Sequence, residues 1–230
     1  MEINILKKVL SANDAVAETT RELFSENKVF AVNLMGSPGS GKTTLIEKTI
    51  EIMKDKFSVG VIEGDIFSTL DAERISKLNI PIAQINTGPF GGDCHLEAGW
   101  VKEAALTLEL SKLDLIFIEN VGNLVCPAEF DTGADKNVVV LSLPEGEDKP
   151  IKYPLMFRTS EVMLINKLDL LKVLKVDITH LLKNAEKVNP ALSIFQVSAA
   201  TGDGFDLWNE WLIKEMGKKR DKKSQIFFKT

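Results

Sequence analysis

Cysteine and histidine are scarce in this sequence, with two residues of each among 230. So few cysteines exclude a disulfide-stabilised scaffold and favour a reducing compartment, the cytoplasm. No apolar run approaches the roughly 18 residues that a membrane-spanning helix needs, and the N-terminus shows no signal-peptide pattern. A formal net charge of −5 argues against nucleic acid as the main partner. The sequence therefore predicts a cytoplasmic protein without a membrane span.

The chain is long enough for one domain with a sizeable core, at about 150 residues per typical domain. We assign residues 1–217 to this domain, with an N-terminal helix at 1–27, and residues 218–230 to a basic, solvated tail. Short apolar runs predict strands at 29–35, 59–62, 80–85, 115–118, 138–143, 162–165 and 194–197. Helical periodicity alternates with them at 42–54, 95–111, 170–187 and 205–217. This alternation predicts an α/β fold, a mostly parallel sheet with helices on both faces.

A glycine-rich motif follows the first predicted strand. It fits G-x-x-x-x-G-K-[ST] in full and opens the helix predicted at 42–54, which indicates a P-loop NTPase. The backbone N–H groups of such a loop surround phosphate groups, and the helix N-terminus adds partial positive charge. Lys42 would reach the β- and γ-phosphates, and the Thr43 hydroxyl would bind Mg²⁺. The candidate phosphate-binding residues are Gly36, Ser37, Pro38, Gly39, Ser40, Gly41, Lys42, Thr43 and Thr44.

A second motif, Asn166-Lys167-Leu168-Asp169, directly follows the strand predicted at 162–165. It is similar to the guanine-recognition motif of GTPases, in which the carboxylate accepts from N1–H and from the exocyclic amino group of guanine. Adenine lacks this pair of donors and would leave Asp169 unpaired. Ser198-Ala199-Ala200, after the last predicted strand, is similar to the second guanine-contacting loop of GTPases. GTP is therefore the predicted nucleotide.

Acidic residues near the strand ends are candidates for binding Mg²⁺ and for orienting the attacking water. Glu119 ends a segment that resembles a Walker B strand, Asp65 follows the second predicted strand, and Asp71 lies where a loop passes into a helix. Each can instead be a helix cap or a solvated charge. Asn123 occupies the neighbourhood in which Ras-type GTPases place glutamine, so we expect a carboxylate to position water and intrinsic hydrolysis to be slow. The predicted catalytic residues are Lys42, Asp65 and Asp71.

Most of the scarce cysteine and histidine falls in two short segments. Cys94 and His95 are adjacent, and Cys126 lies seven residues beyond Glu119, near the predicted nucleotide site. Sulfur and imidazole ligands favour Ni²⁺ or Zn²⁺ over Mg²⁺. Three ligands do not close a structural zinc site, whereas a two-fold interface would supply a second set. The alternative is that the cysteines are small core residues and His95 caps a helix; we interpret His180 as structural.

Taken together, these motifs resemble one family. The chain is similar over residues 28–211 to HypB, the GTPase family of nickel insertion into [NiFe]-hydrogenase. The resemblance is carried by G-S-P-G-S-G-K-T-T-L-I-E, E-G-D-I, D-A-E-R-I, C-H-L-E-A, I-E-N-V-G-N-L-V-C-P-A-E-F-D, E-G-E-D-K-P-I-K-Y-P and N-K-L-D-L. HypB belongs to the P-loop class that includes the urease accessory GTPase UreG, in which GTP drives dimerisation.

The resemblance implies a GTP-dependent homodimer that delivers nickel, with a nickel chaperone and a hydrogenase large subunit as partners. It implies that Lys152 reaches the nucleotide of the partner subunit. Two ligand sets also follow from it: Thr43, Asp71 and Glu119 for Mg²⁺, and Cys94, His95 and Cys126 for Ni²⁺ or Zn²⁺ at the dimer interface.

Two departures from the family pattern affect the metal site. The short T-G-K-x-C-H turn of the family is replaced here by the longer segment 87–95, with Pro89 in place of a basic residue and with additional glycines. We expect the insertion Pro89–Asp93 to loosen this loop and to alter the metal geometry. The N-terminus carries neither a cysteine motif nor a histidine-rich stretch, so only the interface site is predicted.

We predict that GTP and Mg²⁺ order residues 65–74 and favour the dimer, so that nucleotide binding and metal binding are coupled. Three alternatives stay open. A maturation GTPase of urease or of another nickel enzyme would share this chemistry with a different client. A regulatory GTPase without metal would bury the cysteines in its core. A small-molecule kinase would use the same P-loop but would not need the N-K-x-D motif.

Overall fold

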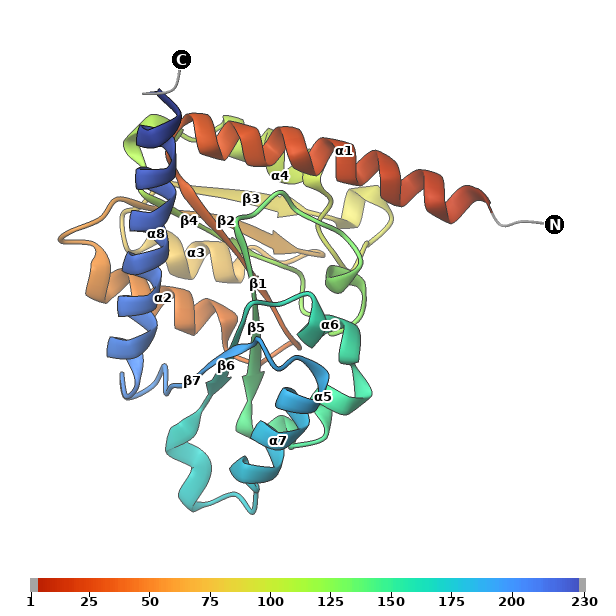
Figure 1. The fold of residues 1–230 in the computed structure, drawn as a ribbon, viewed down its shortest axis with the longest axis vertical. Helices are drawn as coiled ribbons and strands as arrows, with labels where there is room; N and C mark the ends of the chain where they lie inside the picture. The colour runs from red at the N-terminus through yellow and green to blue at the C-terminus, as the bar shows by residue number, and fades with distance from the viewer. Residues whose placement is uncertain (1–3, 228–230) are drawn as a thin grey trace.

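The computed structural model describes residues 4–227, which form a seven-stranded sheet covered by helices (Figure 1). Its strands are β1 (Phe30–Met35), β2 (Val59–Asp65), β3 (Ile82–Asn86), β4 (Leu115–Glu119), β5 (Lys136–Ser142), β6 (Val162–Asn166) and β7 (Ser193–Gln196). They are ordered β3-β2-β4-β1-β5-β6-β7, and each neighbouring pair is parallel. The predicted α/β fold is confirmed, and each predicted strand is present with small shifts at its ends.

Helices cover both faces of the sheet. They are α1 (Asn4–Glu26), α2 (Lys42–Met53), α3 (Leu70–Ser76), α4 (Ala98–Leu106), α5 (Lys149–Lys152), α6 (Pro154–Arg158), α7 (Ile178–Val188) and α8 (Phe205–Phe227). On one face, α2 and α8 contribute Leu45 and Trp208 to the core. On the opposite face, α1 and α4 cover β2 and β4, while α7 covers β5 and β6. Because β1 and β4 have helices on both sides, they are buried along their whole length.

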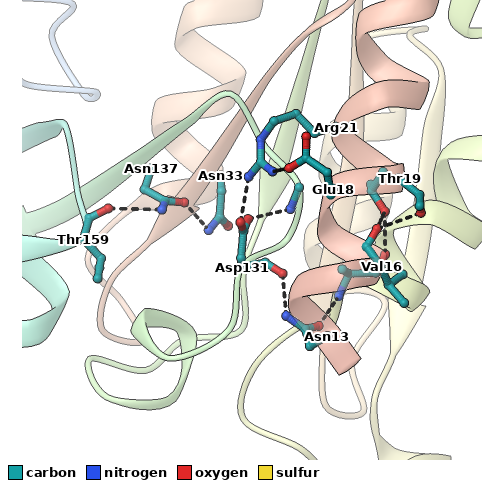
Figure 2. Close-up of polar contacts among 12 residues, drawn as sticks. Asn13, Val16, Glu18, Thr19, Arg21, Asn33, Asp131, Asn137 and Thr159 are labelled. Carbon is teal, nitrogen blue, oxygen red and sulfur yellow. Dashed lines mark hydrogen bonds and ion pairs between the residues drawn. The ribbon is translucent and has the colours of Figure 1, made fainter. Parts of the chain in front are cut away.

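The N-terminal helix is fixed to the domain by polar contacts (Figure 2). Asn13 donates to the Asp131 carbonyl and accepts from the Ala98 N–H, both at 2.9 Å. Arg21 forms an ion pair with the Asp131 carboxylate at 2.7 Å. α1 therefore contacts two segments that are far apart in the sequence, the start of α4 and the loop between β4 and β5. The predicted helix is confirmed from residue 4; residues 1–3 lie outside the described residues.

Two predicted helices start later in the structure, and α4 also ends earlier than predicted, at Leu106 instead of residue 111. α4 begins at Ala98 and not at residue 95, because His95 and Leu96 belong to the loop that precedes it. α7 begins at Ile178 and not at residue 170. Residues 168–172 form a separate 3₁₀ turn, and the Asp177 side chain caps α7 by accepting from the His180 N–H at 3.1 Å.

The expectation of a basic, solvated tail from residue 218 is wrong for the residues that the structure describes. α8 continues to Phe227, so the basic run lies in its last turns. Lys219 reaches the Asp135 carboxylate at 2.6 Å and the Val29 carbonyl at 2.7 Å, and Arg220 pairs with Asp114. These partners lie next to the sheet and hold the end of the helix against it. Residues 228–230 lie outside the described part. No helix among the described residues is long and apolar enough to cross a membrane.

Candidate nucleotide and metal site

A cavity of about 550 Å³ opens at the carboxyl ends of β1, β2 and β4. Its wall includes Lys42 and Thr43 from the phosphate loop, Asp65 and Glu119 from the strand ends, and Lys167 from the loop after β6. In parallel α/β sheets, ligand sites form at this edge because the strand ends and the helix N-termini face it together. The sequence motifs for phosphate and for guanine therefore meet at one cavity.

The phosphate loop has the backbone that a phosphate cradle needs. Gly41 precedes α2 with φ of +94°, and a Cβ atom at this position would lie 2.4 Å from Asn166 Nδ2, so only glycine fits. The Lys42 ammonium lies over the loop, 3.3 Å from the Gly36 carbonyl oxygen and 3.4 Å from that of Ser37. Because Lys42 is buried, the pKa of its ammonium is lowered from the ordinary value. An anion beside this buried cation would gain a strong electrostatic interaction.

Two buried carboxylates lie beside the phosphate loop and fit a hard cation. The Thr43 hydroxyl donates to Glu119 Oε1 at 2.7 Å, and Glu63 is the register partner of Glu119 on the neighbouring strand. The second oxygen of each carboxylate is buried and has no hydrogen-bond partner among the described residues. Burial raises the pKa of Glu119 to about 7 and that of Glu63 to about 8, and for Glu63 the neighbouring Glu119 adds to the shift. Orphaned carboxylate oxygens next to a hydroxyl are the ligand chemistry of Mg²⁺.

Glu63 is a site residue that the sequence interpretation missed. Only Asp65 was selected from the segment that ends β2. Residues two apart on a strand point to the same face, so Glu63 shares the face of Asp65 and also lines the cavity. This period-two relation is the signal that identifies Glu63, but the predicted strand ends at Ile62 and therefore does not include this residue.

The two other acidic candidates lie at the cavity but engage protein groups. Asp65 Oδ1 accepts from the N–H groups of Phe67 and Ser68, at 2.9 and 2.6 Å. Asp71, in the first turn of α3, lies 3.4 Å from the Arg74 guanidinium. Both carboxylates line the cavity wall. The structure thus places them where a catalytic or magnesium role is possible, and those roles stay predictions.

The N-K-x-D motif is joined to the phosphate loop by side-chain hydrogen bonds. Asn166 Nδ2 donates to the Ser40 carbonyl at 3.0 Å, and its Oδ1 accepts from the Ala199 N–H at 3.1 Å. Lys167, which has a φ of +62°, extends its ammonium to within 2.7 Å of the Gly39 carbonyl. Asn166 therefore joins the phosphate loop, the end of β6 and the loop after β7 into one unit.

The remaining candidates for nucleotide contact lie at different places. Ser198 Oγ donates to Asp169 Oδ1 at 2.5 Å, which fixes the carboxylate that is predicted to read guanine. Ala200 is exposed on the same loop. Lys152 lies outside the cavity on α5, where its exposed side chain pairs with Asp148 at 2.5 Å. A contact of Lys152 with a partner subunit stays a prediction.

The two cysteines meet, although 32 positions separate them in the sequence. The Cys94 thiol donates to Cys126 Sγ at 2.6 Å, and both thiols are free and partly buried. The burial of Cys126 and its contact with Cys94 raise the pKa of its thiol to about 11. Metal binding here must therefore displace protons, as is general for thiolate ligands.

The inserted loop that carries Cys94 is closed by hydrogen bonds of its own, and the expectation that the insertion loosens it stays a prediction. Residues 88–90 form a 3₁₀ turn, and the Thr87 hydroxyl closes the loop by donating to the Asp93 carbonyl at 2.7 Å. The Gly92 N–H adds a bond to the Thr87 carbonyl at 3.0 Å. Positive φ angles at Gly91 and Gly92 permit this path, so the additional glycines shape the turn.

His95 lies against Phe130 in this structure, and its role as a metal ligand stays a prediction. Its ring packs on Phe130 with 3.7 Å between the ring centroids, and only 8% of the residue is exposed. Both ring nitrogens are buried without a hydrogen-bond partner, and burial lowers the pKa of the imidazole. In the described part of the chain, no three Cys, His, Asp or Glu side chains assemble as a metal site. Contact with Phe130 holds the ring in an apolar environment that sequence spacing does not reveal.

Comparison with known proteins adds to this geometry. The family model described as CobW/HypB/UreG, nucleotide-binding domain, matches residues 30–196. The hydrogenase maturation factor HypB of Escherichia coli is 46% identical over 212 residues, covering 92% of this chain and 71% of that protein. A probable hydrogenase maturation factor HypB of Methanocaldococcus jannaschii is 41% identical and covers 93% of this chain and 96% of its own length. The crystal structure of HypB from Helicobacter pylori in complex with nickel superposes with a TM-score of 0.84 at 37% identity, covering 92% of this chain and 96% of that one.

Proposed function

Because the chain belongs to the CobW/HypB/UreG nucleotide-binding family, and within it to the HypB hydrogenase maturation factors, we propose that it hydrolyses GTP and carries nickel to a hydrogenase precursor in the cytoplasm. The observation that supports this proposal best is the contact of Cys94 and Cys126 beside the nucleotide cavity. Two thiols at this place offer soft ligands to a metal within reach of a nucleotide-dependent conformational change.

The nucleotide reaction uses the residues at the strand ends. Lys42 binds the β- and γ-phosphate oxygens, and the N-terminus of α2 adds its partial positive charge. Mg²⁺, when bound, neutralises charge that develops between these phosphates. Thr43 and Glu119 would hold the cation, and Asp71, which pairs with Arg74 in this structure, would be a further ligand. Asp65 orients the attacking water once the bound nucleotide has ordered residues 65–74.

Guanine is selected by the loop after β6. Asp169 accepts from N1–H and from the exocyclic amino group of the base, while the bond from Ser198 keeps its carboxylate in place. The Ala200 N–H would donate to the base oxygen, because the Ala199 N–H is already bonded to Asn166 Oδ1. An adenine base would leave Asp169 without its donors, which costs about 1–3 kcal/mol for a desolvated group.

Nickel is the metal that the protein carries, and the thiol pair binds it first. Both thiols lose their protons on binding, so the affinity rises with pH below the pKa of the thiols. His95 follows Cys94 directly, and its unpartnered nitrogens make it the nearest available third ligand if the ring leaves Phe130. A GTP-dependent homodimer places a second such set opposite the first and completes the coordination shell. GTP hydrolysis then separates the two subunits and returns the protein to its starting state.

The proposal is tested by nickel titration of the purified protein, read by metal content and by molecular mass. We expect stoichiometric binding by the wild type and dimerisation with Mg²⁺ and a non-hydrolysable GTP analogue. Replacing both Cys94 and Cys126 by serine should lower nickel affinity about 100-fold, while GTP turnover stays within about two-fold, because the thiols do not line the nucleotide cavity. Replacing His180 by alanine is the matched control and should change neither. Full nickel affinity in the double serine variant would contradict the proposal.

A further inference from the structure

The segment between β4 and Cys126 follows the phosphate loop closely. The Asn120 N–H donates to the Leu34 carbonyl at 2.9 Å, just before the loop begins. Gly122 lies against Pro38 so closely that a Cβ atom at position 122 would approach the proline ring to 2.9 Å. Asn123 then forms an isolated antiparallel bridge with Gly36, and its N–H donates to the Gly36 carbonyl at 3.0 Å. The segment is therefore fixed to the phosphate loop through its own backbone.

The side chain of Asn123 connects this bridge to the second cysteine. Its Oδ1 accepts from the Val125 N–H at 2.6 Å and from the Cys126 N–H at 3.3 Å. Cys126 opens the 3₁₀ turn Cys126–Ala128, so the two bonds fix the start of the turn that carries the thiol. One residue thus contacts the phosphate loop with its backbone and the thiol-bearing turn with its side chain.

The Gly36 carbonyl oxygen accepts hydrogen bonds from two different donors. It accepts from the Asn123 N–H at 3.0 Å and from the Lys42 ammonium at 3.3 Å. The phosphates of a bound nucleotide compete for the same ammonium, because Lys42 is the cation of the loop. Phosphate binding therefore changes the donors on the carbonyl to which Asn123 is attached.

The first cysteine is attached to a different part of the nucleotide cavity. The N–H groups of Thr87 and Gly88 donate to the carbonyls of Asp65 and Ile66, at 2.9 and 2.8 Å. Its loop is therefore fixed to the end of β2 at Thr87, while beyond Cys94 the Leu96 N–H donates to Asn120 Oδ1 at 3.2 Å. Cys126 is fixed to the phosphate loop through Asn123. The Sγ–Sγ distance then depends on how these two walls of the cavity are placed relative to each other.

We propose that Asn123 is a positioning residue that couples the phosphate loop to the Cys126 thiol, and so makes nickel affinity depend on the bound nucleotide. The inference rests on the proposed function and names the residue through which its coupling acts. The γ-phosphate of GTP draws the Lys42 ammonium farther from the Gly36 carbonyl than the β-phosphate of GDP does, which shifts the Gly36–Asn123 bridge. The Asn123 side chain transmits the shift to Cys126. The Cys94 loop is also fixed to β2, so the geometry of the thiol pair changes.

Two substitutions separate coupling from a merely structural role. Asn123→Ala removes the acceptor for the Val125 and Cys126 N–H groups, whereas Asn123→Asp keeps an acceptor oxygen at the same place. Gly122→Ala disturbs the contact with Pro38 and leaves the Asn123 side chain intact. Asn27→Ala is the matched control, because Asn27 bonds the Leu23 carbonyl at 3.0 Å at the end of α1, outside the cavity wall.

The experiment measures the nickel dissociation constant by competition with a chromophoric chelator, in Mg²⁺ with GDP and in Mg²⁺ with GTPγS. The quantity of interest is the ratio of the two constants. We expect a ratio of about 5–150 in the wild type, the usual range for coupled sites, and a similar ratio in Asn123→Asp and Asn27→Ala. In Asn123→Ala and Gly122→Ala the ratio should fall to within about two-fold of unity, with nickel still bound in both states.

The outcomes separate this inference from the proposed function. If both Asn123→Ala and Gly122→Ala keep the wild-type ratio of the two nickel dissociation constants, the role of Asn123 is overturned. The proposed function as a nickel carrier is not affected by that result. If only one of the two variants folds, the ratio of its two nickel dissociation constants decides whether Asn123 has this role. A ratio of unity in the wild type would overturn the coupling itself and this inference with it.

Discussion

The nucleotide cavity and the thiol pair lie next to each other but are built differently. The cavity is formed by regular elements: three strand ends, the N-terminus of α2 and a glycine loop between them. The thiol pair lies on two irregular segments, whose shape depends on single side chains such as Thr87 and Asn123. Regular elements fix their residues through many backbone hydrogen bonds, whereas these loops depend on few. The phosphate loop is therefore preformed, whereas residues 65–74 and the two cysteine segments are the parts that can change.

The same contrast appears in the groups that each region leaves unpaired. In the cavity, the orphaned atoms are carboxylate oxygens of Glu63 and Glu119, which face the place of a cation. At the metal region, the orphaned atoms are the nitrogens of His95, which face Phe130 instead of the thiols. The cavity has the Glu63 and Glu119 carboxylates in position, whereas the metal region must move the His95 ring to complete its set. Three substitutions test this contrast, from the largest expected effect to the smallest.

Lys42→Ala tests whether the two regions can be separated. We expect GTP turnover to fall by at least about 100-fold, because the variant loses the buried cation that stabilises the phosphates in the transition state. Nickel affinity in the absence of nucleotide should shift toward the value that the wild type shows with GTPγS, because the variant lacks the Lys42 bond to the Gly36 carbonyl. Phosphate release and nickel competition measure the two quantities. An unchanged nickel affinity would show that the bond from Lys42 to Gly36 does not act on the thiol pair.

Asp169→Asn tests whether the preformed region also determines base selection. The substitution keeps the size of the side chain but removes the acceptor pair for guanine. We expect the affinity for GDP to fall about 10- to 100-fold, corresponding to about 1–3 kcal/mol for the lost charged hydrogen bonds. Binding of fluorescent GDP and ADP analogues measures the discrimination, with Asp177→Asn as the control, since Asp177 only caps α7. Unchanged preference for GDP over ADP would contradict the guanine assignment.

Glu63→Gln tests the unpaired carboxylate that the sequence interpretation missed. Because the pKa of Glu63 is raised from 4.5 to about 8, the folded nucleotide-free protein retains a proton that the unfolded chain releases between these pH values. The contribution of Glu63 to the free energy of unfolding is therefore complete below pH 4.5 and is lost as the pH rises toward 8. Glutamine does not titrate, so the melting temperature of the variant minus that of the wild type should rise with pH.

This effect amounts to about 10 °C at most and is measured by thermal unfolding in EDTA from about pH 5 to 8. Glu210→Gln, at an exposed position of α8, is the control, and its difference from the wild type should not follow that course. A pH-independent difference for Glu63→Gln would show that this carboxylate is ionised in the folded protein. Such a result would contradict the electrostatic repulsion between the Glu63 and Glu119 carboxylates that the structure indicates.

Much of the fold was predictable because its signals are local. Seven apolar runs gave the strands, and the glycine motif gave the turn into α2. The boundary of α7 was not predictable from periodicity, because the 3₁₀ turn at 168–172 continues the same apolar spacing. The end of α8 was missed for another reason. A run of lysines predicts a solvated segment. In the structure, the contact of Lys219 with Asp135 brings one of these lysines against the sheet.

The residues of the candidate site also fall into two groups, those that local sequence signals predict and those that depend on tertiary contacts. The phosphate loop and N-K-x-D are contiguous motifs whose spacing is set by local backbone geometry, so each residue lies where its motif requires. His95 depends on a contact with Phe130, which is 35 positions away, and no spacing rule contains that contact. Thr87 closes the inserted loop through a bond to Asp93 that composition alone does not reveal. Residues on regular elements could be predicted, and those held by long-range side-chain contacts could not.

The central claim is that the nucleotide determines how tightly the thiol pair holds nickel. The most direct test is the nickel dissociation constant of the wild-type protein, measured in Mg²⁺ with GDP and again in Mg²⁺ with GTPγS. We predict that the two constants differ by at least about five-fold, the lower end for coupled sites. Equal constants would contradict the claim, because a nucleotide that leaves the metal affinity unchanged cannot control the metal.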